Sequence, residues 1–248
     1  MNILVGVSQV PDTTAKIVVA ANGTQIDASG IKFICNPYDE YAIEEGLRLR
    51  EKHGGTVTVV TCGPDGAKDV LRTALAMGAD KAILVKDAAK GDSFTVASSI
   101  AAVAASVQAD IVILGRQSID YDSFQMAPTV AELMNQPSIS MVSKLEIDGT
   151  AIRAERDVEG GKEQLETTLP CVISVQKGIN DPRYPKLPDI MKAKSKPIEE
   201  VAPAAAESRT ATVAMEIPSA KRRQTILGSE DADIAEFVRL LHEEAKAF

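Results

Sequence analysis

The sequence predicts an α/β fold: a mainly parallel sheet with flanking helices, β-hairpin additions and an extended C-terminal arm that ends in a helix. Short β-branched runs alternate with longer amphipathic runs over the first two-thirds of the chain. The short runs are apolar along almost their whole length, which is typical of strands buried on both faces of a parallel sheet. Strand, crossover helix and strand repeated in this way indicate a nucleotide-binding, Rossmann-like arrangement.

The apolar runs of this first part are expected to be strands because they combine β-branched residues with a strand-like length. They cover Ile3–Val7, Thr56–Thr61, Ala82–Val85 and Ile111–Leu114.

The amphipathic runs predict helices. The first begins at Asn36-Pro37, a capping asparagine followed by proline at the first helical position, and extends to about His53. Within it Glu44 and Arg48 are spaced i, i+4, which indicates a solvated face. The other helices are expected over Asp65–Met77, Asp92–Val107 and Ser123–Met134.

The pattern changes after these helices. Turn signals at Asp148-Gly149 and Gly160-Gly161 separate runs that favour β-hairpins. The corresponding strands are expected over Ser138–Ile147, Thr150–Arg156, Glu163–Thr168 and Cys171–Val175.

The chain becomes irregular and proline-rich after Gly178, until an amphipathic helix is expected over Asp231–Lys246. A stretch of roughly 50 residues with little pattern is too long for an ordinary loop. We therefore expect a domain over residues 1–179 and an arm over residues 180–248 that becomes ordered against another molecule. The alternative is a mobile linker followed by a helix that packs back on its own domain.

Composition excludes several classes of protein. Among 248 residues, 27 Lys and Arg stand against 35 Asp and Glu, a formal net charge of −8, which argues against nucleic-acid binding. Three cysteines without a CxxC spacing suggest a reducing compartment and no metal site. The first residues read as a strand rather than a basic leader, and no apolar run approaches the ~18–20 residues of a membrane span. We expect a cytoplasmic protein without membrane insertion.

Small and polar residues follow the predicted strands, where a parallel sheet binds its ligands. They lie in Gly6–Thr13, Asn36–Asp39, Thr61–Pro64 and Gly115–Gln125. The last segment is dense in groups that bond sugars, bases and phosphates, beside a helix N-terminus that favours anions. Neither GxGxxG nor GxxxxGK[ST] occurs, and no nucleophile–base pair is evident, so the pattern indicates binding rather than hydrolysis.

Each of these features also has a purely structural interpretation. Asn36 could be only a helix cap, and Cys62 only a small buried residue at a strand end. Asp120 and Asp122 could be turn formers. The convergence of several polar strand ends favours a ligand site over the structural interpretation.

Two long motifs resemble the β subunit of electron transfer flavoproteins. The first is Arg156–Leu165, with acidic residues and glycines, followed by the apolar Leu169–Ser174 opened by proline. The second is Asn180–Lys194, which is similar to the family's partner-recognition segment. The resemblance follows nearly the whole chain.

This resemblance implies a heterodimer of α and β subunits that carries electrons as FAD, held mainly by the α subunit. The β subunit would bind AMP and contribute a wall near the flavin, with no catalytic residue and no metal. Carried over by position, the AMP pocket would involve Gly6, Asn36, Pro37, Tyr38, Asp39, Cys62, Gly115, Arg116, Gln117, Ser118, Ile119, Asp120, Tyr121, Asp122, Ser123, Phe124, Gln125 and Met126.

The resemblance also implies partners. The arm would wrap the flavin domain of the α subunit. Leu187 would be the anchor that docks flavin-dependent dehydrogenases, and electrons would leave to a quinone-linked oxidoreductase. The segment around this anchor comprises Lys186, Pro188, Ile190, Met191, Lys192 and Lys194.

Two departures leave alternatives open. Residues 120–126 differ from the Asp/Asn-rich version of AMP-binding members, and Val10–Thr13 looks like the start of electron-bifurcating members. Those members bind a second FAD in place of AMP and have NADH activity. Thr13 stands where AMP-type members place an aromatic residue toward the flavin. We favour the simple carrier with AMP over the bifurcating enzyme, and over a non-redox nucleotide-binding regulatory protein.

Overall fold

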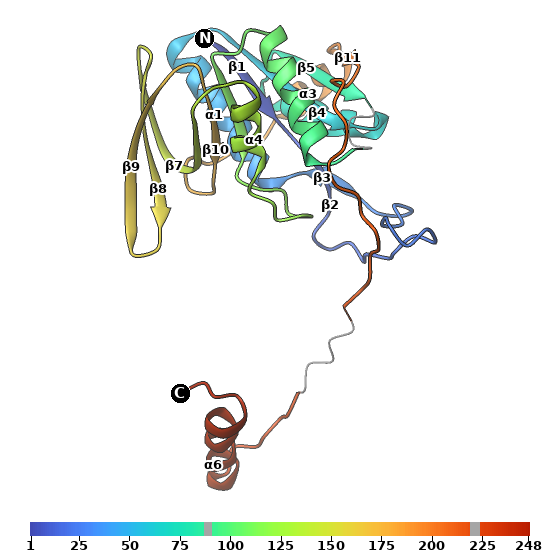
Figure 1. Cartoon of the computed structure of the whole chain (residues 1–248), viewed down its shortest axis with the longest axis vertical. Helices are drawn as coiled ribbons and strands as arrows, with labels where there is room; N and C mark the ends of the chain where they lie inside the picture. The colour runs from blue at the N-terminus through green and yellow to red at the C-terminus, as the bar shows by residue number, and fades with distance from the viewer. Residues whose placement is uncertain (87–90, 219–223) are drawn as a thin grey trace.

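A nine-stranded sheet forms the centre of the computed structural model, which describes residues 1–86, 91–218 and 224–248. The strand order is β11-β5-β4-β1-β6-β10-β7-β8-β9 (Figure 1). The strands from β11 to β7 pair in parallel, and β8 and β9 continue the sheet in antiparallel pairing. The predicted α/β class, with a mainly parallel sheet and hairpin additions, is confirmed.

The strands expected in the first part of the chain are confirmed, with ends that differ by one or two residues. They are β1 (Asn2–Gly6), β4 (Thr56–Gly63), β5 (Lys81–Lys86) and β6 (Ile111–Gly115). Their interior residues are almost all buried, because helices cover both faces of the parallel sheet.

The hairpin strands also occur where the sequence predicts them. They are β7 (Ser138–Asp148), β8 (Ala151–Val158), β9 (Gly161–Thr168) and β10 (Cys171–Val175). Gly149 and Gly160 form the two turns with φ of 58° and 83°, a conformation that glycine adopts without strain. A separate pair, β2 (Gln9–Pro11) and β3 (Phe33–Cys35), lies outside the main sheet.

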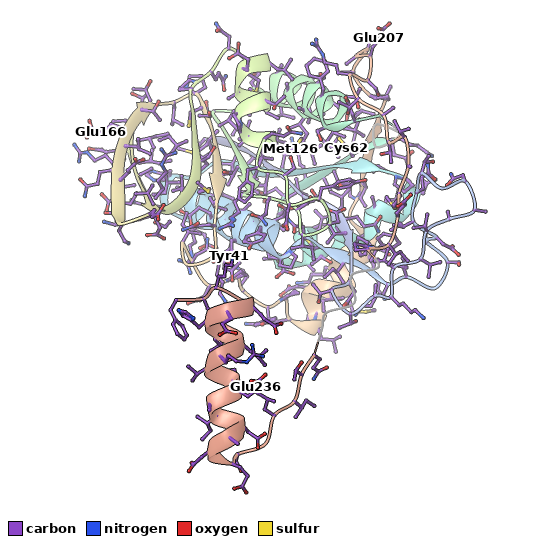
Figure 2. The ribbon with its side chains drawn as sticks, turned by 60° about the horizontal axis from the view of Figure 1, so that its bottom comes forward. Tyr41, Cys62, Met126, Glu166, Glu207 and Glu236 are labelled. Atoms are coloured by element: carbon purple, nitrogen blue, oxygen red, sulfur yellow. The ribbon has the colours of Figure 1, made fainter. Side chains whose placement is uncertain are left out.

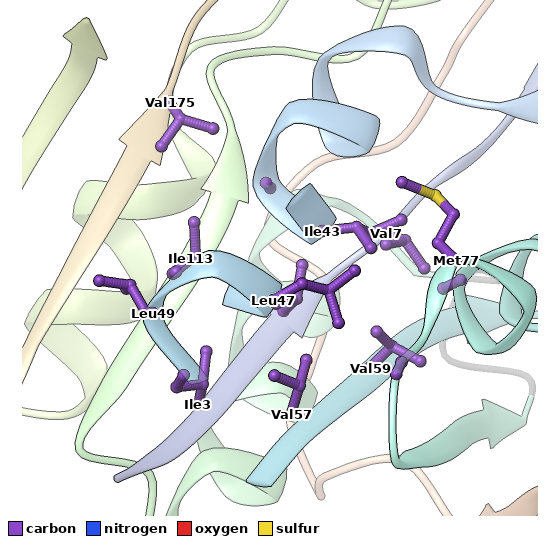
Figure 3. Packing of buried hydrophobic residues seen from close by; sticks show 14 of the residues in the cluster. Ile3, Val7, Ile43, Leu47, Leu49, Val57, Val59, Met77, Ile113 and Val175 are labelled. Atoms are coloured by element: carbon purple, nitrogen blue, oxygen red, sulfur yellow. The ribbon is translucent and has the colours of Figure 1, made fainter. Parts of the chain in front are cut away.

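Helices on the two faces enclose two apolar cores. One face packs against α1 (Pro37–His53) and α2 (Lys68–Met77), the latter preceded by the short 3₁₀ helix η1 (Asp65–Ala67). Figure 3 shows this core, with Leu47 of α1 near Val57 and Ile43 of α1 near Val7. The other face packs against α3 (Ser93–Ser106) and α4 (Met126–Leu133).

Three expectations for the helices need correction. The fourth helix begins at Met126 rather than Ser123, so Ser123–Gln125 remain in the preceding loop. The side chain of Asn36 bonds a neighbouring loop instead of capping α1. Glu44 is buried instead of solvated, because the chain after β10 crosses over it.

Residues 180–196, which we call the strap, run from the end of β10 across α1 and α2. The strap contains α5 (Leu187–Ser195), which packs against α2. It leads into β11 (Glu199–Val201), which the sequence pattern did not indicate and which pairs with β5. Figure 1 shows β11 next to β5.

The end of the chain is arranged differently. The final helix comprises α6 (Asp231–Arg239) and a π-helical turn, η3 (Leu240–Glu244), so it ends two residues earlier than expected. All of its residues are described, and none is buried. The helix lies apart from the sheet in Figure 1, and its side chains project freely in Figure 2. Residues 219–223 of the expected arm lie outside the described residues.

Candidate nucleotide site

The carboxyl ends of β1 and β6 mark the point where the strand order reverses. From β1 the chain moves through β4 to β5 on one side, and then returns to β6 on the other side of β1. Open α/β sheets bind ligands in the crevice outside such a reversal. We call the residues gathered there the strand-end edge; they are Gly6–Ser8, Asn36–Asp39, Thr61–Gly63 and Gly115–Met126.

Asp39, in the first turn of α1, joins the ends of the two strands. Its Oδ2 accepts the backbone N–H of Ser8 at 2.7 Å, and its Oδ1 accepts that of Gly115 at 3.2 Å. Burial raises the pKa of Asp39 to about 7, although bonds from Ser8, Asn36 and Gly115 lower it in part. The two backbone amides are therefore occupied by the protein itself, and Asp39 fixes the spacing of β1 and β6.

Asn36 connects the start of α1 to the loop after β6. Its Nδ2 donates to the carbonyl of Gln117 at 2.9 Å, and its Oδ1 accepts the backbone N–H of Ile119 at 3.3 Å. The side chain is completely buried. A buried amide that is bonded on both sides holds the loop in one position relative to the helix.

Two glycines of the edge lie close to neighbouring atoms of the chain itself. A Cβ on Gly115 would lie 2.2 Å from Asp39 Oδ1 and 2.9 Å from the backbone carbon of Tyr38. A Cβ on Gly6 would lie 2.3 Å from the side chain of Leu114. The contact at Gly115 includes backbone, which cannot move aside cheaply, so α1 approaches β6 this closely because glycine stands there. The contact at Gly6 is with the end of a flexible side chain, which can shift.

Arg116 gathers the aromatic residues of the edge. Its guanidinium carbon lies 5.2 Å from the ring centre of Tyr38 and 5.1 Å from that of Phe124, within cation–π range. Its Nε donates to the side-chain oxygen of Gln117 at 2.8 Å. The structure thus brings together a cation, two rings and an amide at the strand-end edge.

The rest of the loop between β6 and α4 is held by hydrogen bonds within the loop itself. Asp122 has a φ of 50°. Its backbone N–H donates a hydrogen bond to the carbonyl of Ser118, and its side-chain Oδ1 accepts one from Nε2 of Gln117. Tyr121 is 77% exposed, and Asp120 and Gln125 are exposed as well. Ser123 is half-buried, and Met126 begins α4.

Cys62 lies next to the end of β4 and is partly buried. Burial raises the pKa of its thiol to about 12, so the thiol stays protonated and is a poor nucleophile. Thr61 beside it is buried, and its hydroxyl has no hydrogen-bond partner among the residues that the structure describes. A buried hydroxyl without a partner at this edge is a group that a ligand could satisfy.

Two features predicted from the sequence lie outside the strand-end edge. Thr13 is exposed in the turn after β2. In this turn Oδ1 of Asp12 accepts hydrogen bonds from the backbone N–H and the hydroxyl of Thr14. The partner-recognition residues lie on the strap, at α5. Leu187 and Met191 are 73% and 58% exposed there, so neither side chain belongs to the core.

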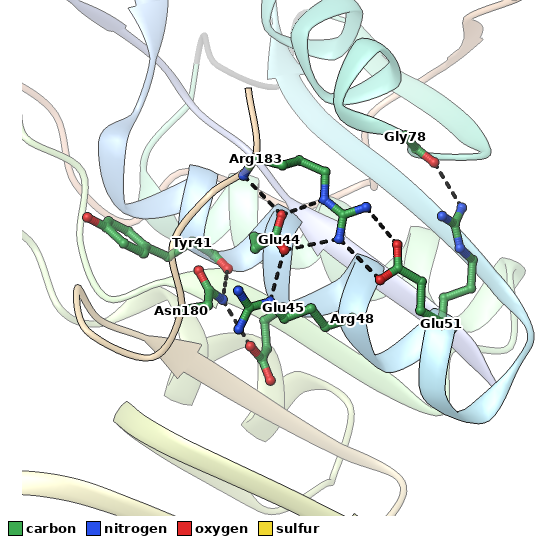
Figure 4. A network of polar contacts seen from close by, with 9 residues as sticks. Tyr41, Glu44, Glu45, Arg48, Glu51, Gly78, Asn180 and Arg183 are labelled. Atoms are coloured by element: carbon green, nitrogen blue, oxygen red, sulfur yellow. Dashed lines mark hydrogen bonds and ion pairs between the residues drawn. The ribbon is translucent and has the colours of Figure 1, made fainter. Parts of the chain in front are cut away.

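A polar network that the sequence pattern does not indicate holds the strap on α1. Arg183 bonds Glu44 and Glu51, and Asn180 bonds Glu45 (Figure 4). The i, i+4 spacing of Glu44 and Arg48 is correct as a local pair, with 2.9 Å between Arg48 Nε and Glu44 Oε1. Local spacing carries no information about a residue 139 positions away.

The described residues contain no group of three or more His, Cys, Asp or Glu side chains that could hold a metal ion. Within the same residues, no helix has the length and apolar character needed to cross a membrane.

The fold and the edge define an α/β protein whose polar groups converge where parallel sheets bind their ligands. A family model described as the electron transfer flavoprotein domain matches residues 23–206. The chain is 44% identical over 257 residues to the electron transfer flavoprotein subunit beta of Bacillus subtilis, covering 99% of each chain. It therefore belongs to the electron transfer flavoprotein family, and within it to the β subunits.

Further relatives carry the same name. The protein of Syntrophomonas wolfei is 40% identical over 222 residues, with 89% of this chain and 87% of the relative covered. The human protein is 36% identical over 208 residues, with 82% of each covered. The resemblance noted from the two sequence motifs is thus confirmed.

Proposed function

We propose that this chain pairs with an electron transfer flavoprotein α subunit to form a soluble heterodimeric electron carrier in the cytoplasm. In this proposal the α subunit holds most of the FAD, and this chain supplies a wall beside the flavin and binds AMP as a structural nucleotide. FAD supplies the redox chemistry when bound. Membership of a family of electron transfer subunits supports a redox role over the regulatory alternative.

The observation that carries the nucleotide part is the strand-end edge itself. Arg116, Tyr38 and Phe124 offer a cation and aromatic faces suited to a base or a phosphate. Thr61 offers an unsatisfied hydroxyl at the same edge. The residues proposed to hold AMP are those named from the sequence, Gly6, Asn36–Asp39, Cys62 and Gly115–Met126, with Asn36 and Asp39 acting through the backbone that they hold in place.

Nucleotide content tests this part. Acid release from the purified heterodimer, followed by mass spectrometry, should give AMP and FAD in near-equal amounts. Two FAD per heterodimer and no AMP would favour a bifurcating enzyme with NADH activity, with Thr13 near a flavin. Absence of any flavin from co-expressed material would contradict the electron-carrier proposal altogether.

We further propose that α5 docks flavin-dependent dehydrogenases and that the reduced carrier passes its electrons to a quinone-linked acceptor. Leu187 is exposed at the first position of α5, and Lys186, Lys192 and Lys194 around it are exposed too. An exposed leucine in a segment with several exposed lysines suits a small, transient contact in which charges steer the encounter.

Leu187→Ala tests the docking role. Burying a leucine side chain contributes ~1.5–3 kcal/mol, so its loss should weaken docking about tenfold to a hundredfold. FAD content and thermal stability should stay unchanged, because the side chain is 73% exposed. A normal rate of reduction by the dehydrogenase would contradict the docking assignment.

A further inference from the structure

Arg183 fastens the strap to the middle of α1 (Figure 4). Its Nε donates to Glu44 Oε2 at 2.7 Å and its Nη2 to Glu44 Oε1 at 3.0 Å. The same guanidinium donates to Glu51 at 2.6 Å and 3.2 Å. The backbone N–H of Arg183 also donates to Glu44, at 3.1 Å. One residue of the strap is therefore held through both its backbone and its side chain.

Glu44 is a buried carboxylate that attracts arginine strongly. Its side chain is 4% exposed, whereas that of Arg183 is 35% exposed. Burial alone raises the pKa of Glu44, but bonds from Arg183 and Arg48 outweigh it and leave the pKa lowered. Arg48 bonds the same carboxylate, yet among the described residues it makes no hydrogen bond to the strap.

Asn180 adds a second contact between the strap and α1, and like Arg183 it precedes α5 in the chain. Its Nδ2 donates to the carbonyl of Tyr41 at 3.0 Å and to Glu45 Oε2 at 2.9 Å. The side chain is buried. The start of the strap therefore follows the surface of α1 closely.

The far end of α5 is held on α2. Arg72 Nη1 donates to the carbonyl of Ala193 at 2.6 Å and to that of Lys196. Lys196 Nζ donates to the carbonyl of Ala79 at 2.9 Å. The last carbonyls of a helix lack partners within the helix, and Arg72 supplies one from outside.

These ties matter because α5 is short. A helix of nine residues has little stability of its own, so its position depends on what holds its ends. Only Ala193 of its residues is buried, while Leu187 and Met191 are turned to solvent.

We propose that Arg183 is a positioning residue for partner docking: by bonding Glu44 and Glu51 it fixes the start of α5 and thereby the direction in which Leu187 is presented. The inference rests on the proposed docking role of α5. A side chain held in its bound position loses less conformational freedom on binding than a mobile one. Without Arg183, Leu187 is chemically intact but less well placed, so docking weakens while electron transfer within the docked complex does not change.

Steady-state reduction of the flavin-loaded heterodimer by a flavin-dependent dehydrogenase tests the proposal. Arg183→Gln should raise the KM for the heterodimer roughly three- to tenfold, a modest coupling between neighbouring residues, and leave kcat unchanged. Arg183→Lys should give a smaller rise, because an ammonium cannot bond two carboxylates in a fork. Arg48→Gln is the matched control: it removes the other arginine from Glu44 and should leave KM unchanged.

The double variant Arg183→Gln, Leu187→Ala identifies the route of the effect. If Arg183 acts by placing Leu187, the double variant should show the KM of Leu187→Ala alone. Additive effects would overturn the proposal, since Arg183 would then act independently of Leu187. A raised KM for Leu187→Ala with a normal KM for Arg183→Gln would also overturn it, while docking by α5 would stand. Normal values for both single variants would contradict the docking role itself.

Hydrogen exchange gives a readout that does not depend on docking. Amides 184–195 in the heterodimer should exchange faster in Arg183→Gln than in the unaltered protein, and not in Arg48→Gln. If Arg183→Gln does not fold, Glu51→Gln replaces it, because Glu51 lies at the surface and binds only the outer part of the guanidinium. Unchanged exchange in the variant that folds would overturn the proposal.

Discussion

Asp39 is a carboxyl group that the folded chain keeps buried at the junction of β1, β6 and α1. Burial raises its pKa from 3.8 to about 7, so the folded chain retains a proton that the unfolded chain releases. The contribution of Asp39 to the free energy of unfolding therefore falls as pH rises from about 4 to about 7, and it does not change with pH below that window.

Asp39→Asn should remove this pH dependence. Between about pH 4 and pH 7 the unfolding free energy of the unaltered chain should fall by a few kcal/mol relative to that of the variant. Urea unfolding across this range measures the difference. The variant also loses one acceptor for a backbone amide, which lowers its stability at every pH, so the informative quantity is the slope. Parallel curves for the two proteins would show that Asp39 ionises normally.

A second prediction at the scale of single residues concerns Gly115. A Cβ there would lie 2.2 Å from Asp39 Oδ1 and 2.9 Å from the backbone of Tyr38, and backbone cannot move aside cheaply. Gly115→Ala should destabilise the chain by about 1–3 kcal/mol, the usual cost of overpacking. Gly161→Ala is the control, because a Cβ there meets nothing within 4 Å. Equal stability of both variants in denaturant titration would mean that α1 and β6 separate without cost.

At the scale of elements, α6 has an apolar face that the described chain leaves about half exposed. Ile234, Phe237 and Val238 are 53%, 52% and 48% exposed, and their spacing places them on one side of the helix. An uncovered stripe of this kind usually marks an interaction surface. It supports the proposal that the arm becomes ordered against the α subunit, and the division of the chain at residue 179 stays a prediction.

Phe237→Asp should weaken assembly with the α subunit without altering the fold of the remaining chain. A charge in a covered apolar face is costly, whereas α6 contributes no buried residue to the described fold. Ala232→Asp, on the opposite side of the same helix, is the control. Sedimentation of mixed subunits measures the affinity. Equal affinities would show that this face of α6 is not part of the interface.

The elements also show what can be predicted from sequence and what cannot. The strands β1, β4, β5 and β6 are predictable because burial on both faces leaves continuous apolar runs. By contrast, β11 consists of Glu199–Val201, a short edge strand with two exposed residues, and such a strand has no hydrophobic pattern.

The candidate site likewise has a part that can be predicted from the sequence and a part that cannot. Strand ends predict where Asn36, Asp39 and Gly115 gather, because topology places them at one edge. The roles of their side chains could not be predicted: Asn36 bonds a loop 81 residues away in sequence, and only tertiary structure brings the two together. The early helix start expected at Ser123 failed for a similar reason, since Asp122 and Gln117 hold that loop in another conformation.

At the scale of the whole molecule, α1 connects the two proposed functional regions. Its first turn carries Asp39 at the strand-end edge, and its middle carries Glu44 and Glu45, which hold the strap. A ligand that binds only the folded edge stabilises the structure by mass action. Because the strap is bonded to the same helix, nucleotide binding at the edge should also favour the ordered strap.

The charge distribution of the whole molecule makes the last prediction. The chain carries a formal net charge of −8, yet the exposed lysines Lys186, Lys192 and Lys194 lie in the same short segment as Leu187. A local cationic surface on an acidic protein attracts an acidic partner to one place and repels it elsewhere. Salt screens such steering over a Debye length of about 8–10 Å at moderate ionic strength, so raised salt should slow reduction by the dehydrogenase.

Lys186→Gln combined with Lys194→Gln should reduce both the rate at low salt and its dependence on salt. Lys162→Gln, on the β9 edge of the sheet, should leave that dependence unchanged. Stopped-flow reduction at increasing ionic strength measures these slopes, and an unchanged slope in the double variant would mean that Leu187 docks without electrostatic steering from these lysines.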